Sequence, residues 1–208
     1  MPRTERPPRR RVESNACFLN IPYDKKFENL YLAYIVGLIA HGFVPRATLG
    51  FPRDARRLER IFHLLQRCEF SVHDISRIEL DRKPPRAPRF NMPFELGLAV
   101  AWTILNPKQH VWVGCDAVPH RPLKSLSDLN GTDFHIHEGT VAGVLRSLCN
   151  AFVSRSQRPT VPRMMRVYRR LRRAIPDLQQ EAGTRDLFEA RIFSDLVVAA
   201  HRLWEQQP

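Results

Sequence analysis

The stretch Arg89-Phe90-Asn91-Met92-Pro93-Phe94-Glu95-Leu96-Gly97-Leu98 is the segment around which this chain is organised. Asn91 is a good N-cap residue, and Pro93 is tolerated in a first helical turn because its missing N–H would have no partner there. Residues 96–105 are apolar on every side, which predicts a buried helix. Glu95 is the only ionisable residue of that helix, and a buried carboxylate is costly unless something pairs with it or uses it.

Two explanations for Glu95 follow from this position. Acidic residues often belong to the start of a helix, where the helix dipole favours an anion. Ordinary first-turn acids, however, lie on helices that face water. We therefore expect a catalytic carboxylate that stays ionised in the first turn of a buried helix, at the floor of a cleft, facing a substrate that develops positive charge.

Short apolar runs alternate with helical patterns on both sides of this stretch. The expected strands are residues 16–21, 43–45, 70–74, 110–115 and 133–137. The expected helices are residues 27–39, 54–67, 91–105 and 141–152, of which the first is the most clearly amphipathic and the second points its arginines outward. This alternation predicts an α/β protein, with a doubly wound parallel sheet of about five strands.

The chain divides into three parts. Residues 1–14 are expected to be a flexible basic arm, residues 15–153 the α/β domain, and residues 154–208 a helical C-terminal extension. The extension begins with a linker and continues as two helical segments, 163–174 and about 184–204. The second segment has an apolar stripe that either the domain or a second subunit must cover. We favour the second subunit, and hence a homo-oligomer formed through these helices.

The formal net charge of +12 is concentrated in three segments. Residues 1–14 contain five basic and two acidic side chains, residues 76–90 contain the same numbers, and residues 155–173 contain eight basic and no acidic ones. These segments account for more than the whole net charge, so the rest of the chain is almost neutral. Such charge either keeps a surface soluble or attracts an acidic partner such as nucleic acid, a nucleotide's phosphates or an acidic protein. The arginines at 163–173 are expected on several helix faces.

Neither the cysteines nor the histidines suggest a metal or a disulfide framework. The four cysteines fall inside expected strands or helices without the paired spacing of a zinc site. His135 and His137 share one face of a strand but lack a third ligand, so no metal is expected. The arginine- and proline-containing N-terminus has no apolar segment typical of a signal peptide, and no apolar run is long enough to span a bilayer. These features predict a cytoplasmic protein without a membrane partner.

Polar side chains follow the first and third strands and open the central helix. In an open parallel sheet, ligands bind beyond the carboxyl ends of the strands, so these side chains are expected to meet at one edge. No glycine-rich phosphate fingerprint follows the first strand, so side chains and the helix N-terminus would have to hold a nucleotide. The candidate residues are Asn20, Tyr23, Asp24, Asp74, Ser76, Asn91 and Glu95.

A strand ending in Asp74-Ile75-Ser76, then a variable loop and Asn-Met-Pro-Phe-Glu-Leu-Gly-Leu-Ala at 91–99, resembles a known superfamily. That superfamily contains the nucleoside 2-deoxyribosyltransferases and the bacterial TIR-like nucleotide-binding proteins, and the resemblance covers roughly residues 16–150. It implies a flavodoxin-like or TIR-like fold, with Glu95 as the carboxylate that acts on an N-glycosidic bond. It also implies that Asp74 lies near the base or ribose and that Tyr23 and Asp24 supply first-loop contacts.

The chain departs from both branches of the superfamily. Pro88-Arg89-Phe90-Asn91 replaces the Asp- and Gly-rich approach of the transferases and is closer to the TIR-like branch. The Trp-Cys pair that often precedes the glutamate in metazoan and plant TIR domains is missing.

The function implied first is an N-glycosidase that hydrolyses NAD, as substrate and not cofactor, to nicotinamide and an ADP-ribose product in bacterial defence signalling. An ionised carboxylate suits this chemistry, because breaking a ribosyl–nitrogen bond creates an oxocarbenium-like centre that the carboxylate can stabilise or trap. Two alternatives remain open. One is a non-catalytic nucleotide-sensing module that assembles with partners, and the other is a nucleoside 2-deoxyribosyltransferase.

Overall fold

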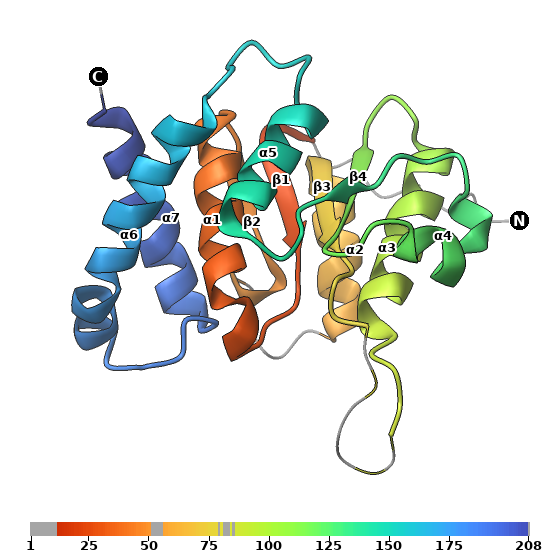
Figure 1. The fold of residues 1–208 in the computed structure, drawn as a ribbon, viewed down its shortest axis with the longest axis horizontal. Coiled ribbons are helices and arrows are strands. Elements are labelled where there is room, and N and C mark those ends of the chain that lie inside the picture. Colours follow the sequence, from red (N-terminus) through yellow and green to blue (C-terminus); the bar gives the residue numbers. More distant parts are fainter. Residues whose placement is uncertain (1–11, 51–55, 79, 81–83, 85, 208) are drawn as a thin grey trace, which may run out of the picture.

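The computed structural model of the protein describes residues 12–50, 56–78, 80, 84 and 86–207. Five strands form one sheet in the order β2-β1-β3-β4-β5, and every neighbouring pair is parallel (Figure 1). The strands are β1 (Glu13–Asn20), β2 (Val44–Arg46), β3 (Cys68–Asp74), β4 (Val111–Asp116) and β5 (His135–Ile136). The predicted parallel α/β sheet is therefore confirmed, and its strand order is the flavodoxin-like one.

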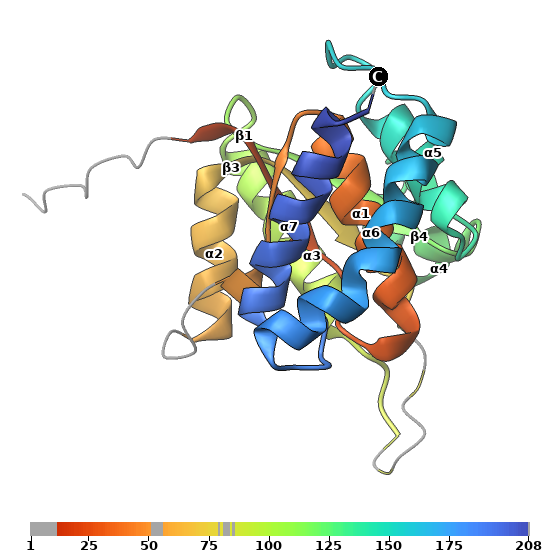
Figure 2. The ribbon, with the colours of Figure 1, turned by 90° about the vertical axis from the view of Figure 1, so that its left-hand side faces the viewer.

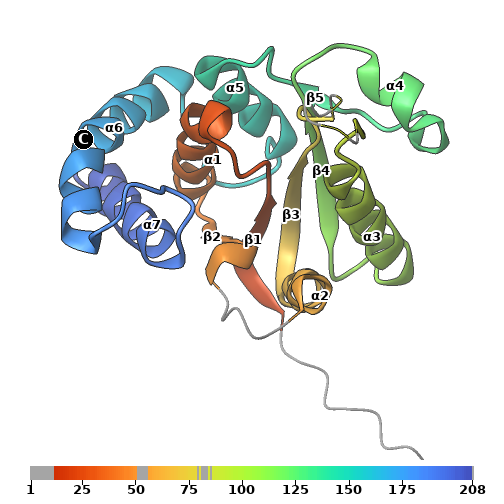
Figure 3. The ribbon, with the colours of Figure 1, turned by 90° about the horizontal axis from the view of Figure 1, so that it is seen from below.

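Helices cover both faces of this sheet. The helices are α1 (Glu28–Ala40), α2 (Arg57–Arg67), α3 (Asn91–Leu105), α4 (Arg121–Ser125), α5 (Val141–Ala151), α6 (Val161–Ala182) and α7 (Ala190–Glu205). Figure 3 shows α1 and α5 on one face and α2 and α3 on the other, with α6 and α7 outside α1. Because β1 is covered on both faces, its run of consecutive apolar residues is buried throughout, as expected for a central parallel strand.

The helix at the centre of the core is α1, and this differs from the prediction. Eleven of its thirteen residues are buried, since α5 packs on one side and α6 and α7 cover the outer side. Gly37 permits the close approach of α5, because a Cβ atom there would lie 2.4 Å from Cδ1 of Leu148. The predicted amphipathic helix is therefore enclosed on all sides.

The opposite holds for α3, which was predicted to be buried all round. Only Met92, Glu95, Leu96 and Ala99 are buried, and the outer face is open. The side chains at its C-terminal end, Ile104 and Leu105, are 72% and 77% exposed. The described part of the chain places no further layer over this helix, so its uniform apolar composition does not produce uniform burial.

The C-terminal helices extend the core of the α/β unit. Thr160 caps α6 by accepting a hydrogen bond from the backbone N–H of Arg163, and Gly183 ends the helix with a left-handed backbone (φ 72°). The apolar stripe of α7 is buried within the chain, in the same cluster as α1. The prediction that this stripe is free to pack on a second subunit is therefore wrong for its buried members, which are Leu187 before the start of α7 and Ile192, Leu196 and Ala200 within it.

Several predicted boundaries shift in the structure. β1 begins at Glu13, so the last residues assigned to the basic arm belong to the sheet, while residues 1–11 lie outside the described chain. α6 continues through Pro176 to Ala182, well beyond the predicted end at 174. β5 has only two residues where five were expected. The predicted start of the second helix at residue 54 and much of the charged loop before α3 also lie outside the described residues.

Candidate active site

The carboxyl ends of β1 and β3 lie side by side at the point where the chain order of the sheet reverses. Open α/β sheets bind ligands at this place. Asn20 ends β1 and Asp74 ends β3, and both side chains are buried. Their side chains point to opposite faces of the sheet. Asp74 contacts Tyr34 of α1, whereas the amide of Asn20 lies near Glu95 of α3 and lowers its pKa. The predicted site residues therefore separate into two groups.

Glu95 forms the first group with Arg57 and Asn20, which we call the Glu95 cluster. The side chain of Glu95 is 4% exposed, and its Oε1 accepts a hydrogen bond from Nε of Arg57 at 3.0 Å and forms an ion pair with Nη2 of Arg57 at 2.9 Å. Its Oε2 is buried and has no hydrogen-bond partner among the described residues. Buried polar atoms are normally satisfied, so an unsatisfied carboxylate oxygen beside a ligand-binding edge needs a functional explanation.

The position of Glu95 in its helix corrects two predictions. Phe90 is the N-cap and makes no side-chain cap, while Asn91 is the first helical residue. Glu95 is consequently the fifth residue of α3, beyond the first turn where the helix dipole acts most strongly. Arg57, which was expected to point outward on the second helix, supplies the positive charge instead.

The pKa of Glu95 is set by its burial and its neighbours, and not by the helix start as predicted. Burial raises the pKa of Glu95 above the usual value of a glutamate. The charge and hydrogen bond of Arg57 oppose this rise and lower the pKa, and so does the amide of Asn20, which lies near the carboxylate without satisfying Oε2. The ionised form therefore depends on these two neighbours.

A chain of buried hydrogen bonds fixes the amide of Asn20. Nδ1 of His110 lies 2.8 Å from the carbonyl oxygen of Cys68 and must donate to it, so its Nε2 accepts from the Ser71 hydroxyl at 2.9 Å. The Ser71 oxygen then accepts from Nε2 of His73 at 2.9 Å, which leaves Nδ1 of His73 to accept from the Asn20 amide at 3.0 Å. Each bond determines the next, so the Asn20 nitrogen, and not its oxygen, faces His73.

Burial favours the neutral form of both histidines, which is the form that these donor directions assume. Burial lowers the pKa of His73 to about 3, with a further contribution from His110, and burial also lowers the pKa of His110. Sequence analysis missed Ser71, His73 and His110. The available signal was the alternation of Ser71 and His73 along an otherwise apolar strand, which places two polar side chains on the same face.

A cleft of about 470 Å³ opens next to the Glu95 cluster, a volume typical of ligand pockets. Its wall includes Tyr23, Arg57, Arg77, Arg89, Asn91 and Met92. Of the Glu95 cluster, only Arg57 belongs to this wall. Arg57 therefore connects the cleft with the carboxylate of Glu95.

Two predicted residues from the first loop, Tyr23 and Asp24, organise this cleft. The Tyr23 hydroxyl lies 3.5 Å from the hydroxyl of Thr48, and burial raises the pKa of Tyr23 to about 12. Oδ2 of Asp24 pairs with Arg77 at 3.2 Å and with Arg89 at 3.1 Å. Asp24 thus holds two arginines of the wall in place, whereas Tyr23 and the predicted Asn91 line the cleft directly.

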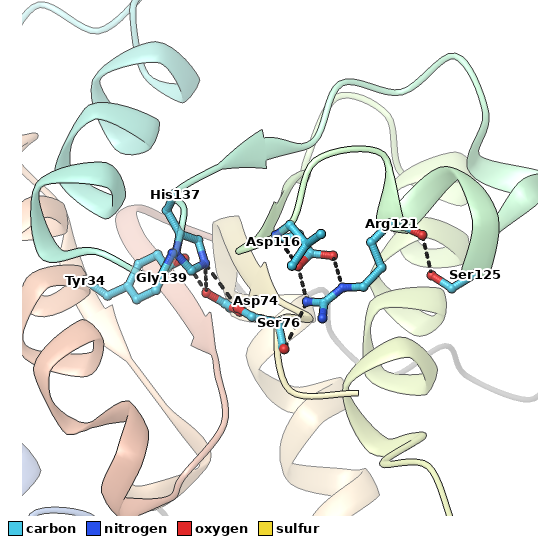
Figure 4. Close-up of polar contacts among 9 residues, drawn as sticks. Tyr34, Asp74, Ser76, Asp116, Arg121, Ser125, His137 and Gly139 are labelled. Atoms are coloured by element: carbon cyan, nitrogen blue, oxygen red, sulfur yellow. Dashed lines mark hydrogen bonds and ion pairs between the residues drawn. The ribbon is translucent and has the colours of Figure 1, made fainter. Parts of the chain in front are cut away.

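The second group, the Asp74 cluster, consists of Tyr34, Asp74, Ser76 and His137 (Figure 4). Oδ2 of Asp74 accepts from the Tyr34 hydroxyl at 2.7 Å and lies 3.0 Å from Nε2 of His137. Oδ1 accepts from the backbone N–H of Ser76 at 2.8 Å and from the Ser76 hydroxyl. Nδ1 of His137 accepts from the backbone N–H of Gly139 at 3.1 Å, so Nε2 carries the proton that points at Asp74 and Ser76.

The Asp74 cluster is closed. The side chains of Asp74 and His137 are fully buried, Ser76 is 6% exposed, and both oxygens of Asp74 already have partners. Beside it, Asp116 at the end of β4 pairs with Arg121, whose guanidinium also donates to the carbonyl oxygen of Ser76 at 2.9 Å (Figure 4). The predicted substrate contacts Asp74 and Ser76 are therefore engaged in joining β3 to α1 and to the segment after β5.

The described residues contain no group of three or more His, Cys, Asp or Glu side chains arranged to hold a metal ion. None of the described helices combines the length and the apolar character needed to cross a membrane. Comparison with known proteins returned no matching family model, no matching curated protein and no matching solved structure. The resemblance to the TIR-like and deoxyribosyltransferase superfamily accordingly stays a prediction.

Proposed function

We propose that this protein cleaves the N-glycosidic bond of a nucleotide, with NAD as the substrate and Glu95 as the catalytic carboxylate. The observation that carries the proposal is the buried carboxylate of Glu95, which has one oxygen without a partner among the described residues and lies next to a cleft at the switch point of the sheet. The arginines of the cleft wall suit a substrate that bears phosphate groups.

The reaction requires little acid–base chemistry from the protein. The electron pair of the bond between C1′ of the ribose and the pyridinium nitrogen leaves with nicotinamide, which becomes neutral and needs no proton. The positive charge that develops at C1′ is stabilised by the ionised carboxylate of Glu95. Water then adds to C1′ and releases one proton, which yields the ADP-ribose product.

The neighbours of Glu95 have separate roles in this proposal. Arg57 and Asn20 oppose the rise in the pKa of Glu95 and so favour the ionised form that the reaction needs. Arg57 also belongs to the cleft wall, so its guanidinium is placed to contact the substrate and the carboxylate together.

The test is to incubate the purified protein with NAD and to measure released nicotinamide by chromatography. We expect release by the wild-type protein and a loss of at least about a thousandfold in the Glu95→Gln variant, because losing an essential catalytic group commonly removes orders of magnitude of rate. Glu59→Gln, an exposed glutamate on α2, is the matched control and should keep the wild-type rate. Equal rates in the Glu95→Gln variant and the wild-type protein would refute the proposal.

A second candidate is a nucleotide-sensing module without turnover. It is favoured by the placement of Arg57, which lines the cleft while Glu95 does not. A ligand held by the arginines then need not reach the carboxylate. Binding of NAD without release of nicotinamide, measured by calorimetry on the same sample, would support this candidate. Base exchange on a deoxynucleoside would instead indicate the deoxyribosyltransferase.

A further inference from the structure

The outer surface of α6 carries four arginines on one face. Arg166, Arg169, Arg170 and Arg173, the basic ridge, are all exposed, and their spacing of three, four and seven residues places them side by side on the helix. The opposite face, including Met164, Val167 and Leu171, is buried against the core. In Figure 2 this helix lies on the side of the molecule that faces the viewer. The arginines predicted to lie on several faces of α6 thus include four that share one.

The arginines of the basic ridge are not held in ion pairs within the described chain. Residues 155–173 contain eight arginines and no acidic residue. Among the described residues none of the ridge arginines forms an ion pair, and Arg170 donates only to the neutral side chain of Gln206, at 3.2 Å. On the neighbouring α7, by comparison, Arg191 is paired with Asp195.

An open groove of about 570 Å³ runs along one flank of the ridge. Arg169, Arg172 and Arg173 line it together with Asn29 and Tyr168, and no carboxylate belongs to its wall among the described residues. The Tyr168 hydroxyl donates to Oδ1 of Asn29 at 3.2 Å, which joins α6 to the start of α1. The charged side chains of this groove are therefore all cationic, next to the apolar Val141 and Met165, whereas the cleft beside Glu95 contains arginines held by Asp24.

We propose that the basic ridge and its groove bind the phosphodiester backbone of a nucleic acid, without regard to base sequence. Arg166 and Arg173 are separated by about 10.5 Å along the helix axis, which corresponds to about three nucleotide steps of a duplex strand. The planar guanidinium group forms paired hydrogen bonds with phosphate oxygens. This binding surface lies on the α1 side of the sheet, away from α3 and Glu95, and is independent of the proposed activity (Figure 3).

The surface of α6 favours nucleic acid over other acidic partners. A specific protein interface normally has an apolar centre, but none of the large exposed hydrophobic side chains of the described chain belongs to α6. A helix that lies in a membrane surface inserts its apolar face, and the apolar face of α6 is buried against α1 and α7. A phosphodiester chain needs neither feature, because counterion release supplies its binding free energy.

The test measures fluorescence anisotropy of a labelled 20-base-pair duplex and of a single strand of the same length, with the full chain, over a series of salt concentrations. The wild-type affinity should fall linearly with salt on logarithmic axes. Arg169→Gln/Arg173→Gln should make the duplex slope shallower by about 1.8 and weaken binding roughly 60-fold at about 0.1 M salt, since each lost phosphate contact contributes about 0.9 to the slope. Arg169→Lys/Arg173→Lys keeps the charge and should keep most of the slope.

The matched control is Arg191→Gln/Arg202→Gln, which removes the same charge from exposed positions of α7. It should leave the slope within about 0.5 of the wild-type value, and Glu95→Gln should bind as the wild-type protein does. The proposal is overturned if neither nucleic acid binds at low salt or if the two double variants lose equal slope. It is also overturned if phosphatidylserine vesicles bind while nucleic acid does not.

Discussion

The Glu95 cluster and the Asp74 cluster lie at the same edge of one sheet but on opposite faces, and they differ in how their carboxylates are satisfied. Both oxygens of Asp74 have partners from Tyr34, Ser76 and His137. In Glu95, one oxygen is paired with Arg57 and the other has no partner within the described chain. Both carboxylates are almost completely buried, so burial alone does not distinguish a structural acid from a candidate catalytic one.

Because of this difference, we expect substitutions in the Asp74 cluster to affect mainly stability and substitutions at Glu95 to affect mainly function. Removing a group from a fully paired buried network leaves its partners unsatisfied, which costs stability. A buried carboxylate with one unsatisfied oxygen already costs stability, and it is tolerated when a ligand or a reaction uses that oxygen. The expected loss of NAD cleavage in Glu95→Gln, with the fold kept, is the largest effect that follows from the comparison.

The next largest effect, a loss of stability, is expected in the Asp74 cluster. Asp74→Asn replaces one accepting oxygen by a donating nitrogen that faces other donors, and should lower the free energy of unfolding by about 3 kcal/mol. In a protein of this size the melting temperature should fall by roughly 6–12 °C. Calorimetry measures this fall, and the folded fraction should still cleave NAD at more than about a tenth of the wild-type rate. A stable Asp74→Asn protein without activity would instead place Asp74 in the catalytic machinery.

The contribution of the Glu95 cluster to stability should fall as the pH rises, whereas that of a carboxylate with a lowered pKa falls as the pH drops. Because the pKa of Glu95 is raised in the folded state, its contribution to stability is greatest below the unfolded value, about 4.3, and is lost as the pH rises through the folded value. Glu95→Gln, which cannot ionise, should therefore gain stability relative to the wild-type protein between about pH 4 and pH 7. Chemical unfolding at pH 4 and pH 7 measures the difference in the free energy of unfolding between the variant and the wild-type protein. A difference that becomes smaller toward pH 7 would show that the effect of Arg57 on the pKa of Glu95 exceeds that of burial.

The smallest effect is expected from the hydrogen-bonded chain behind Asn20. His73→Leu removes the acceptor that orients the Asn20 amide, so Glu95 should lose part of the contribution that lowers its pKa. The acidic limb of the pH–rate profile should then move to higher pH by less than about one unit, while the rate on the plateau is kept. His201→Leu, an exposed histidine on α7, is the control. If the acidic limb lies at the same pH in both variants, the hydrogen bonds behind Asn20 have a structural role only.

The ends of β1 and β3 and the start of α3 meet at one sheet edge, as predicted, whereas the functional roles of the residues there stay predictions. Strand ends can be located from apolar runs, so Asn20, Asp74 and the start of α3 were correctly assigned to one sheet edge. Whether a side chain faces α1 or α3 depends on strand register and on the two-residue alternation at each strand end. Arg57 is distant in sequence from Glu95, and no local pattern identifies it as the partner.

Strand positions and the parallel sheet follow from the sequence alone, because apolar runs of strand length separated by helical patterns have few other ways to be buried. The degree of burial of each helix does not. The helical spacing of apolar residues in α1 predicted one exposed face, yet α6 and α7 cover that face. The uniformly apolar α3 receives no such cover from the described chain. The composition of a helix indicates which environments are compatible with it. The residues that cover α1 lie more than a hundred positions away in the sequence, and only tertiary packing decides which helix they cover.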